Sequence, residues 1–316
     1  MLPTFQLCKI FHIFILMLSL YRLCIGISTN KMCSASMVRL MIIMKISETI
    51  LNWKTIVAGN EKTVPIVILH PEKLRTVTCL ISIGIGGSRT TARKILNRLN
   101  RDDFAIALWP FQAFPPDKKS LHHLSEEAPQ AVIKWLNQQG SVVTKAIGHS
   151  QGANVIIAHA AKYPDSLQQI ALISPTLTPE YWSKTHAAVH IISGLIINGF
   201  IFWRSRDYED KRSAHEVKDY MIRELCTKTH GVHNRLSESF MNALDGGLTR
   251  AAKVIAARDK PSLLVFCGKT DFVASARLIS KSLNLPQENI RLLEGGHASL
   301  LSQKGQSQLK KVIAYL

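Results

Sequence analysis

From residue 50 to the end of the chain, short apolar runs alternate with amphipathic segments of helix length. Eight apolar runs predict β-strands: Trp53–Val57, Val64–His70, Val77–Ile85, Phe104–Trp109, Val142–Gly148, Gln168–Ser174, Ser262–Gly268 and Ile290–Leu293. Several of these runs are almost continuously apolar, which is typical of parallel strands that are buried on both faces.

The spacing of apolar residues also predicts helices between the strands, at residues 90–99, 121–136, 153–161, 274–283 and 308–316. A strand, a helix and a second strand in succession form the right-handed βαβ unit. The pattern therefore predicts an α/β fold with a mostly parallel central sheet flanked by helices.

The first 45 residues differ from the rest, because they contain no Asp or Glu and hold six of the eight Met. The apolar stretch Phe11–Tyr21 has the length of a signal-peptide core rather than of a membrane span. Three interpretations stay open: a secretory signal or membrane anchor, an extension outside the fold, or an upstream start with translation beginning at Met37, Met41 or Met44. The first predicts a secreted or membrane-anchored protein, and a start near Met44 predicts a cytoplasmic one. We expect residues 46–316 to form the main domain.

Composition excludes several classes of protein. A chain of 316 residues with 47% hydrophobic and 19% charged residues is neither disordered nor collagen-like. The six cysteines form no CxxC pair, and the spacings His186/His190 and His230/His233 lack a companion carboxylate motif, so we expect no metal. The net charge of +17 favours anionic surfaces, but without a recognition motif we expect no nucleic-acid partner.

One motif carries candidate chemistry. Gly148-x-Ser150-x-Gly152 stands where a predicted strand ends and a predicted helix begins, which is the context of a nucleophile elbow. The serine of such an elbow lies on a sharp turn, and side chains two residues away on either side would collide with their surroundings. The turn presents the hydroxyl at the carboxyl edge of the sheet, where α/β sheets bind ligands.

Two later loops complete a recognisable set. The strand Ser262–Gly268 is followed by Asp271, and the strand Ile290–Leu293 is followed by Gly295-Gly296-His297. In this order and context the three elements resemble the α/β-hydrolase superfamily, over about residues 50–316. The resemblance implies a catalytic triad in which Ser150 is the nucleophile, His297 the base and Asp271 the group that orients the histidine.

The resemblance also implies an oxyanion hole. The N–H of Gln151 would supply one donor, and the N–H of Ile85 the second. The stretch Gly84-Ile85-Gly86-Gly87-Ser88 looks like the family's HGxGGS-type loop, although Ile83 stands where the family often has His. No cofactor is implied. A dinucleotide site is not indicated, because Arg89 occupies the position of the third glycine in G-x-G-x-x-G.

Other interpretations of these residues stay open. Asp271 could instead be the N-cap of the helix that follows it, or could do both. Glu180 lies near the alternative acid position after Ser174-Pro175. His149 adjoins the serine, but the elbow should turn its side chain away, and we interpret it as a packing residue.

Residues 176–260 interrupt the alternation before the last two strands and have helical character. The resemblance predicts that this segment is an inserted helical cap. Its uncharged run His186–Phe202 favours buried cap helices; an apolar lid over a pocket for an acyl or alkyl group and a membrane-contacting patch are the alternatives.

We therefore expect a serine hydrolase that cleaves a carboxylic ester, a thioester or a related acyl compound with an apolar portion. Its expected partner is a small-molecule acyl substrate. Membrane contact is possible through the leader or the cap. The sequence does not determine the oligomeric state. Cofactor-free haloperoxidase or carbon–carbon-bond hydrolase chemistry on the same fold is one alternative, and a non-catalytic binding protein is the other. A serine at the elbow argues against epoxide or haloalkane hydrolysis, for which the family uses a carboxylate there.

Overall fold

The computed structural model describes residues 46–54, 61–69, 77–84, 104–108, 121–204, 246–297 and 303–316. The chain divides into two units, Met1–Ile43 and Met44–Leu316, and all described residues belong to the second. The predicted leader, the predicted helix at 90–99, residues 205–245 of the predicted cap, and Ile85 and Gly86 all lie outside the described residues.

The described strands form one eight-stranded sheet with the order β1-β2-β4-β3-β5-β6-β7-β8. Their bounds are β1 Ile46–Lys54, β2 Glu61–Leu69, β3 Val77–Ser82, β4 Phe104–Leu108, β5 Lys145–His149, β6 Gln169–Ile173, β7 Ser262–Gly268 and β8 Ile290–Leu293. Among the described strands, only β1 with β2 and β2 with β4 pair antiparallel. Every pair from β4 to β8 is parallel, which confirms the predicted mostly parallel sheet.

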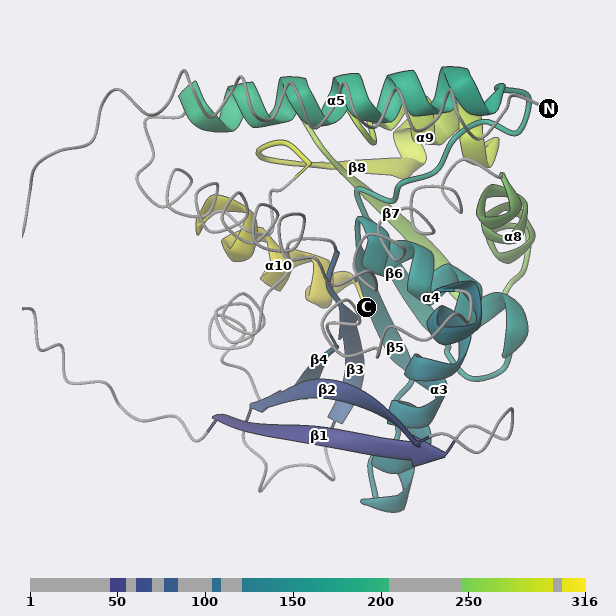
Figure 1. Cartoon of the computed structure of the whole chain (residues 1–316), viewed down its shortest axis with the longest axis vertical. Helices are drawn as coiled ribbons and strands as arrows, with labels where there is room; N and C mark the ends of the chain where they lie inside the picture. The colour runs from purple at the N-terminus through teal and green to yellow at the C-terminus, as the bar shows by residue number, and fades with distance from the viewer. Residues whose placement is uncertain are drawn as a thin grey trace, which may run out of the picture. The chain divides into compact units, whose positions relative to one another are not determined.

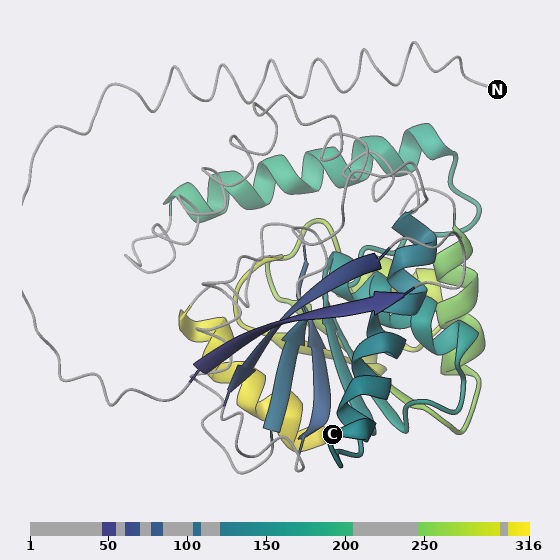
Figure 2. The same cartoon turned by 60° about the horizontal axis from the view of Figure 1, so that its bottom comes forward.

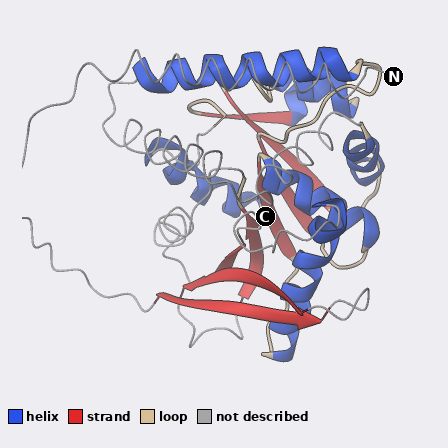
Figure 3. Ribbon diagram, in the orientation of Figure 1, coloured by secondary structure: helices blue, strands red, loops and turns tan. Residues whose placement is uncertain are grey.

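Helices cover both faces of the sheet (Figures 1 and 3). The described helices are α3 Leu121–Gln138, α4 Gln151–Lys162, α5 Lys184–Arg204, α8 Gly247–Ala256, α9 Ala276–Leu283 and α10 Gln303–Tyr315, with a short 3-10 turn η3 at Gln287–Asn289. Residues of α3, α4, α8 and α9 share one buried cluster with one face of the strands. Residues of α10 share a second cluster with the other face.

The two clusters explain why the strands are apolar at successive positions. In β3, Leu80 belongs to the cluster with α3 and α4, whereas its neighbour Ile81 belongs to the cluster with α10. The same alternation separates Leu172 from Ile173 in β6. A strand covered by helices on both faces must be apolar on both, which is the pattern that the sequence showed.

The first strand is where the sequence prediction was wrong. We predicted Trp53–Val57, but β1 covers Ile46–Lys54. Its position follows from antiparallel pairing with β2, from Ile46 opposite Leu69 to Lys54 opposite Glu61. Because strand formation depends on cross-strand neighbours more than on intrinsic preference, local hydrophobicity is a weak guide here.

The strand order changes direction beside β3. From β3 the chain continues to β4 on one side, and β5 then pairs with β3 on its other side. The carboxyl ends of two parallel strands at such a switch point leave a crevice in which α/β proteins bind ligands. The strands β3, β5, β7 and β8 are parallel and all end at this edge, and Figure 2 shows α5 lying across it.

The helix α5 has 21 residues and follows β6. Among the described residues, no helix combines the length and mean hydropathy that a membrane span requires.

Candidate active site

The turn between β5 and α4 places Ser150 in an uncommon backbone conformation. Its φ is 53° and its ψ is −121°, a region that residues other than glycine rarely adopt. Its N–H donates to the carbonyl of Ile173 at 2.9 Å, and its carbonyl accepts from Ala153 N–H at 3.0 Å. The turn is therefore held from both sides, by β6 and by the first turn of α4.

The two motif glycines are sterically required. A Cβ on Gly148 would lie 2.4 Å from the Cα of Ala153, and a Cβ on Gly152 would lie 2.2 Å from the carbonyl oxygen of Ser82. These atoms are backbone and cannot rotate away. The glycines thus let α4 begin directly against the ends of β3 and β5.

The end of β3 approaches the same turn. A Cβ on Gly84 would lie 2.7 Å from Ser150 Cβ and 3.3 Å from Gln151 N. Gln151 is the first residue of α4, so its N–H belongs to the first turn, whose N–H groups have no intrahelical acceptor. Both Gly84 and Gln151 thus border the serine, whereas Ile85 and Gly86 are not among the described residues.

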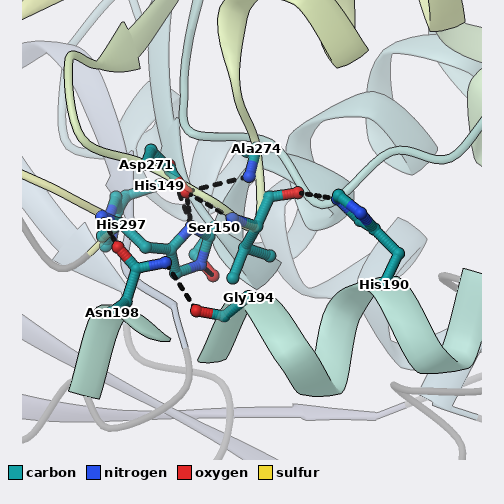
Figure 4. Close-up of polar contacts among 9 residues, drawn as sticks. His149, Ser150, His190, Gly194, Asn198, Asp271, Ala274 and His297 are labelled. Atoms are coloured by element: carbon teal, nitrogen blue, oxygen red, sulfur yellow. Dashed lines mark hydrogen bonds and ion pairs between the residues drawn. The ribbon is translucent and has the colours of Figure 1, made fainter. Parts of the chain in front are cut away.

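The loops after β7 and β8 bring two further side chains to the serine (Figure 4). Ser150 Oγ lies 2.8 Å from His297 Nε2. On the other side of the ring, His297 Nδ1 lies 3.1 Å from Asp271 Oδ2 and 3.2 Å from Oδ1. With a proton on Nδ1, the ring donates to the carboxylate and its Nε2 accepts from the serine hydroxyl.

Asp271 is held by backbone as well as by the histidine. Its Oδ1 accepts from the N–H of Val273 at 2.9 Å and of Ala274 at 2.8 Å. Burial raises the pKa of Asp271, but the charge and hydrogen bond of His297 and the Ala274 N–H outweigh it, and the pKa falls to about 2. The carboxylate is therefore ionised at neutral pH. The N-cap of α9 is Ser275 rather than Asp271, since Ser275 Oγ accepts from Leu278 N–H at 3.3 Å.

Burial increases from the histidine to the acid. The His297 side chain is 12% exposed and that of Asp271 is fully buried. The arrangement can remove a proton from Ser150 Oγ, while the negative charge of Asp271 stays inside the protein.

His149 is buried, which fits its interpretation as a packing residue, but its side chain also contacts the histidine loop, the segment after β8 that carries His297. Its Nε2 lies 2.8 Å from the carbonyl oxygen of His297. Burial, and then repulsion from His297, lowers the pKa of His149 to about 4. A neutral ring with its proton on Nε2 donates to this carbonyl, and the ring therefore joins the elbow to the loop after β8.

Sequence reasoning did not predict that Ser174 lies beside Asp271. This serine follows β6 with φ 48° and is completely buried. Its hydroxyl lies near enough to Asp271 to help lower the pKa of that carboxyl, although it forms no hydrogen bond of standard geometry. Glu180, the alternative acid, instead pairs with Lys253 at 2.7 Å.

A model of the family described as serine aminopeptidase S33 matches residues 119–297. The chain belongs to this family of α/β-hydrolases. The match covers more than half of the sequence and includes the elbow and both loops. A comparison with proteins of curated function found no match.

Solved structures share the fold of this S33 family member at low sequence identity. A putative lipase from Acinetobacter baumannii is 13% identical with a TM-score of 0.56, covering 85% of this chain and 90% of its own. An esterase from Thermogutta terrifontis is 15% identical with a TM-score of 0.59, covering 84% and 97%. A haloalkane dehalogenase from Agrobacterium tumefaciens is 13% identical with a TM-score of 0.55, covering 85% and 95%. At these identities the likeness shows the fold alone.

Proposed function

We propose that this protein is a serine hydrolase that cleaves a carboxylic ester, a thioester or a related acyl compound through an acyl-enzyme. The observation that supports this most directly is the continuous chain of contacts from Ser150 Oγ through His297 to the buried Asp271, at 2.8 and 3.1 Å. Membership of a hydrolase family supports the same reaction class.

The proposed reaction begins with a proton transfer. His297 Nε2 takes the proton of Ser150 as Oγ attacks the substrate carbonyl carbon, and the carbonyl oxygen becomes an oxyanion. When the oxyanion collapses, the bond to the leaving oxygen or sulfur breaks, and that atom takes the proton from Nε2. Water then repeats the sequence on the acyl-enzyme and restores the serine.

Backbone N–H groups would stabilise the oxyanion. Gln151 N–H is one proposed donor, and Ile85 N–H remains the second by sequence analogy. Removal of one such donor costs about 3–4 kcal/mol of transition-state stabilisation. Asp271 would hold the Nδ1 proton and stabilise the imidazolium, and its ionised state at neutral pH suits that role.

The substrate class depends on the segment between β6 and β7. We propose that residues 176–260 form a cap that borders the substrate and favours an apolar acyl or alkyl group. Within the described part of this segment, the side of α5 that contacts the loop carrying Asp271 is apolar at Ala187, Ala188 and Ile191. Phe272, which directly follows Asp271, is 45% exposed.

The test uses a fluorophosphonate probe and a panel of p-nitrophenyl esters of different chain length, with an aminoacyl p-nitroanilide for peptidase activity. We expect the wild type to be labelled and to hydrolyse esters, and Ser150→Ala to lose both by about 10⁴-fold or more. His297→Ala should fall to a similar residual rate, because the three groups act as a unit.

Undiminished labelling of Ser150→Ala would reject the proposed nucleophile. Preference for the aminoacyl substrate would keep the nucleophile but replace the ester as the substrate class. Ser262→Ala is a matched control that should keep full activity, because Ser262 is exposed at the amino end of β7, the end opposite to Asp271.

A further inference from the structure

The helix α5 is docked on the loop that carries Asp271. Ala187, Ala188 and Ile191 are buried in an apolar cluster with Val273 of that loop. His190 adds a polar contact, since its Nε2 lies 3.3 Å from the carbonyl oxygen of Val273 (Figure 4). The N-terminal half of α5 is therefore attached to the acid loop by apolar and polar contacts together.

Further along α5, two glycines allow the helix to approach the site loops closely: Gly194 on the helix and Gly296 on the histidine loop. A Cβ on Gly194 would lie 2.8 Å from the carbonyl oxygen of Phe272. A Cβ on Gly296 would lie 2.7 Å from Asn198 Oδ1. Backbone and side chain of α5 thus reach the residues next to Asp271 and next to His297 with no side chain between them.

Asn198 uses this proximity to contact His297. Its Nδ2 donates to the carbonyl of Gly194 within the helix at 2.8 Å, and its Oδ1 accepts from the His297 N–H at 3.3 Å. The opposite amide orientation would set an NH₂ group against that N–H and an oxygen against the carbonyl of Gly194. The bond inside the helix therefore orients the acceptor toward the histidine loop. Only 7% of Asn198 is exposed.

The backbone of His297 is consequently held by two side chains from separate elements. Asn198 accepts from its N–H, and His149 donates to its carbonyl at 2.8 Å. The two residues before it are Gly295, with φ 95°, and Gly296. Glycine leaves a backbone many conformations. The loop itself therefore restricts the ring little, and contacts from outside the loop set where it points.

We propose that Asn198 is a positioning residue, which holds the His297 backbone so that the ring reaches Ser150. This rests on the proposed hydrolase function. It gives α5 a second role, because the segment that borders the substrate also fixes the base. Loss of the contact should lower kcat with little change in KM, since it disturbs the reacting groups and not substrate binding.

The test compares Asn198→Leu and Asn198→Ala with Ser193→Ala. Leu has the same branched shape as Asn, although it is larger, and makes no hydrogen bond. Ala adds no bulk should Leu disturb packing. Ser193 lies on the exposed side of the same helix and also bonds the carbonyl four residues earlier, that of Val189. The control thus removes the same kind of helix contact without touching the histidine loop.

Two readouts are measured: hydrogen exchange of the His297 amide, which requires no reaction, and the kinetics of ester hydrolysis and fluorophosphonate labelling. In both Asn198 variants we expect exchange at least about tenfold faster and kcat lower by about 10- to 100-fold, with KM within about threefold. Ser193→Ala should match the wild type. Asn198→Asp keeps the acceptor, and its amide exchange should stay slow.

Unchanged amide exchange in both Asn198→Leu and Asn198→Ala would overturn the proposal, and so would a loss seen in KM alone. Failure of the proposed function is a different result. In that case the wild type would be labelled independently of Ser150, while amide exchange would still report whether Asn198 holds the loop.

Discussion

The elbow that carries Ser150 meets the loop that carries His297 where Ser150 Oγ lies 2.8 Å from His297 Nε2. The two segments are held in place by different kinds of contact. The elbow is shaped by residues within its own five-residue motif and by the backbone of neighbouring strands. The histidine loop has two consecutive glycines before His297 and is held mostly by side chains from β5, α5 and the acid loop, besides the Thr270 N–H, which donates to the Gly295 carbonyl at 3.0 Å. Hence a change at the motif glycines should mainly affect folding, whereas changes far from His297 in sequence should affect its alignment.

The largest expected effect is on the elbow. Gly152→Ala forces a Cβ to within 2.2 Å of the Ser82 carbonyl oxygen, so β3 and α4 must separate. We expect a loss of about 4 kcal/mol in the free energy of unfolding, measured by urea denaturation. Gly247→Ala is the control, because the nearest atom to its added Cβ is a flexible side-chain nitrogen of Arg250 at 3.8 Å. A small effect of Gly152→Ala would contradict the steric account of the motif.

The next largest expected effect is the pH dependence of stability at His149, which belongs to the elbow and donates to the carbonyl of His297. Its pKa falls from 6.5 to about 4 on folding, so the unfolded chain binds the proton more tightly between these values. Its contribution to stability is present above pH 6.5 and decreases as the pH falls toward 4, by about 3 kcal/mol. Urea denaturation across this range should show that loss in the wild type and less of it in His149→Gln.

A second variant separates titration from contact. His149→Phe also removes the titrating ring, but unlike Gln it cannot donate to the His297 carbonyl. We expect kcat to stay within about threefold in His149→Gln and to fall by about tenfold in His149→Phe. Equal activity of the two variants would mean that the bond to the loop is not needed for alignment.

The smallest effect should come from Ser174→Ala. The hydroxyl is buried beside Asp271 without a hydrogen bond of standard geometry, and the carboxylate keeps its bonds to Val273 and Ala274 N–H. We expect kcat to fall by no more than about threefold and stability to change by less than about 1 kcal/mol, measured by ester hydrolysis and thermal unfolding. A tenfold loss of kcat would show that Ser174 supports the acid more than the geometry indicates.

The same contrast explains what could be predicted from sequence. The elbow was predictable because its steric requirements fall within Gly148–Gly152. The acid and histidine loops were predictable because each follows an apolar strand and contains glycine. Asn198 was not, since it lies 99 residues from His297 in an uncharged run, and helical spacing does not indicate which polar residue meets a distant loop. The first strand was misplaced for a related reason, because β2 determines its extent.

The strained dihedral angles of Ser150 have a consequence for engineering. Among residues other than glycine, Asp and Asn tolerate positive φ best, and the constraints at this turn act on the backbone and on Gly148 and Gly152. The turn thus fixes the position of the Cβ at residue 150 but does not determine which atom is attached to that Cβ. In Ser150→Cys or Ser150→Asp, the new thiol or carboxylate would point toward the His297 ring from the position that the hydroxyl now has. The same fold could therefore hold different nucleophiles.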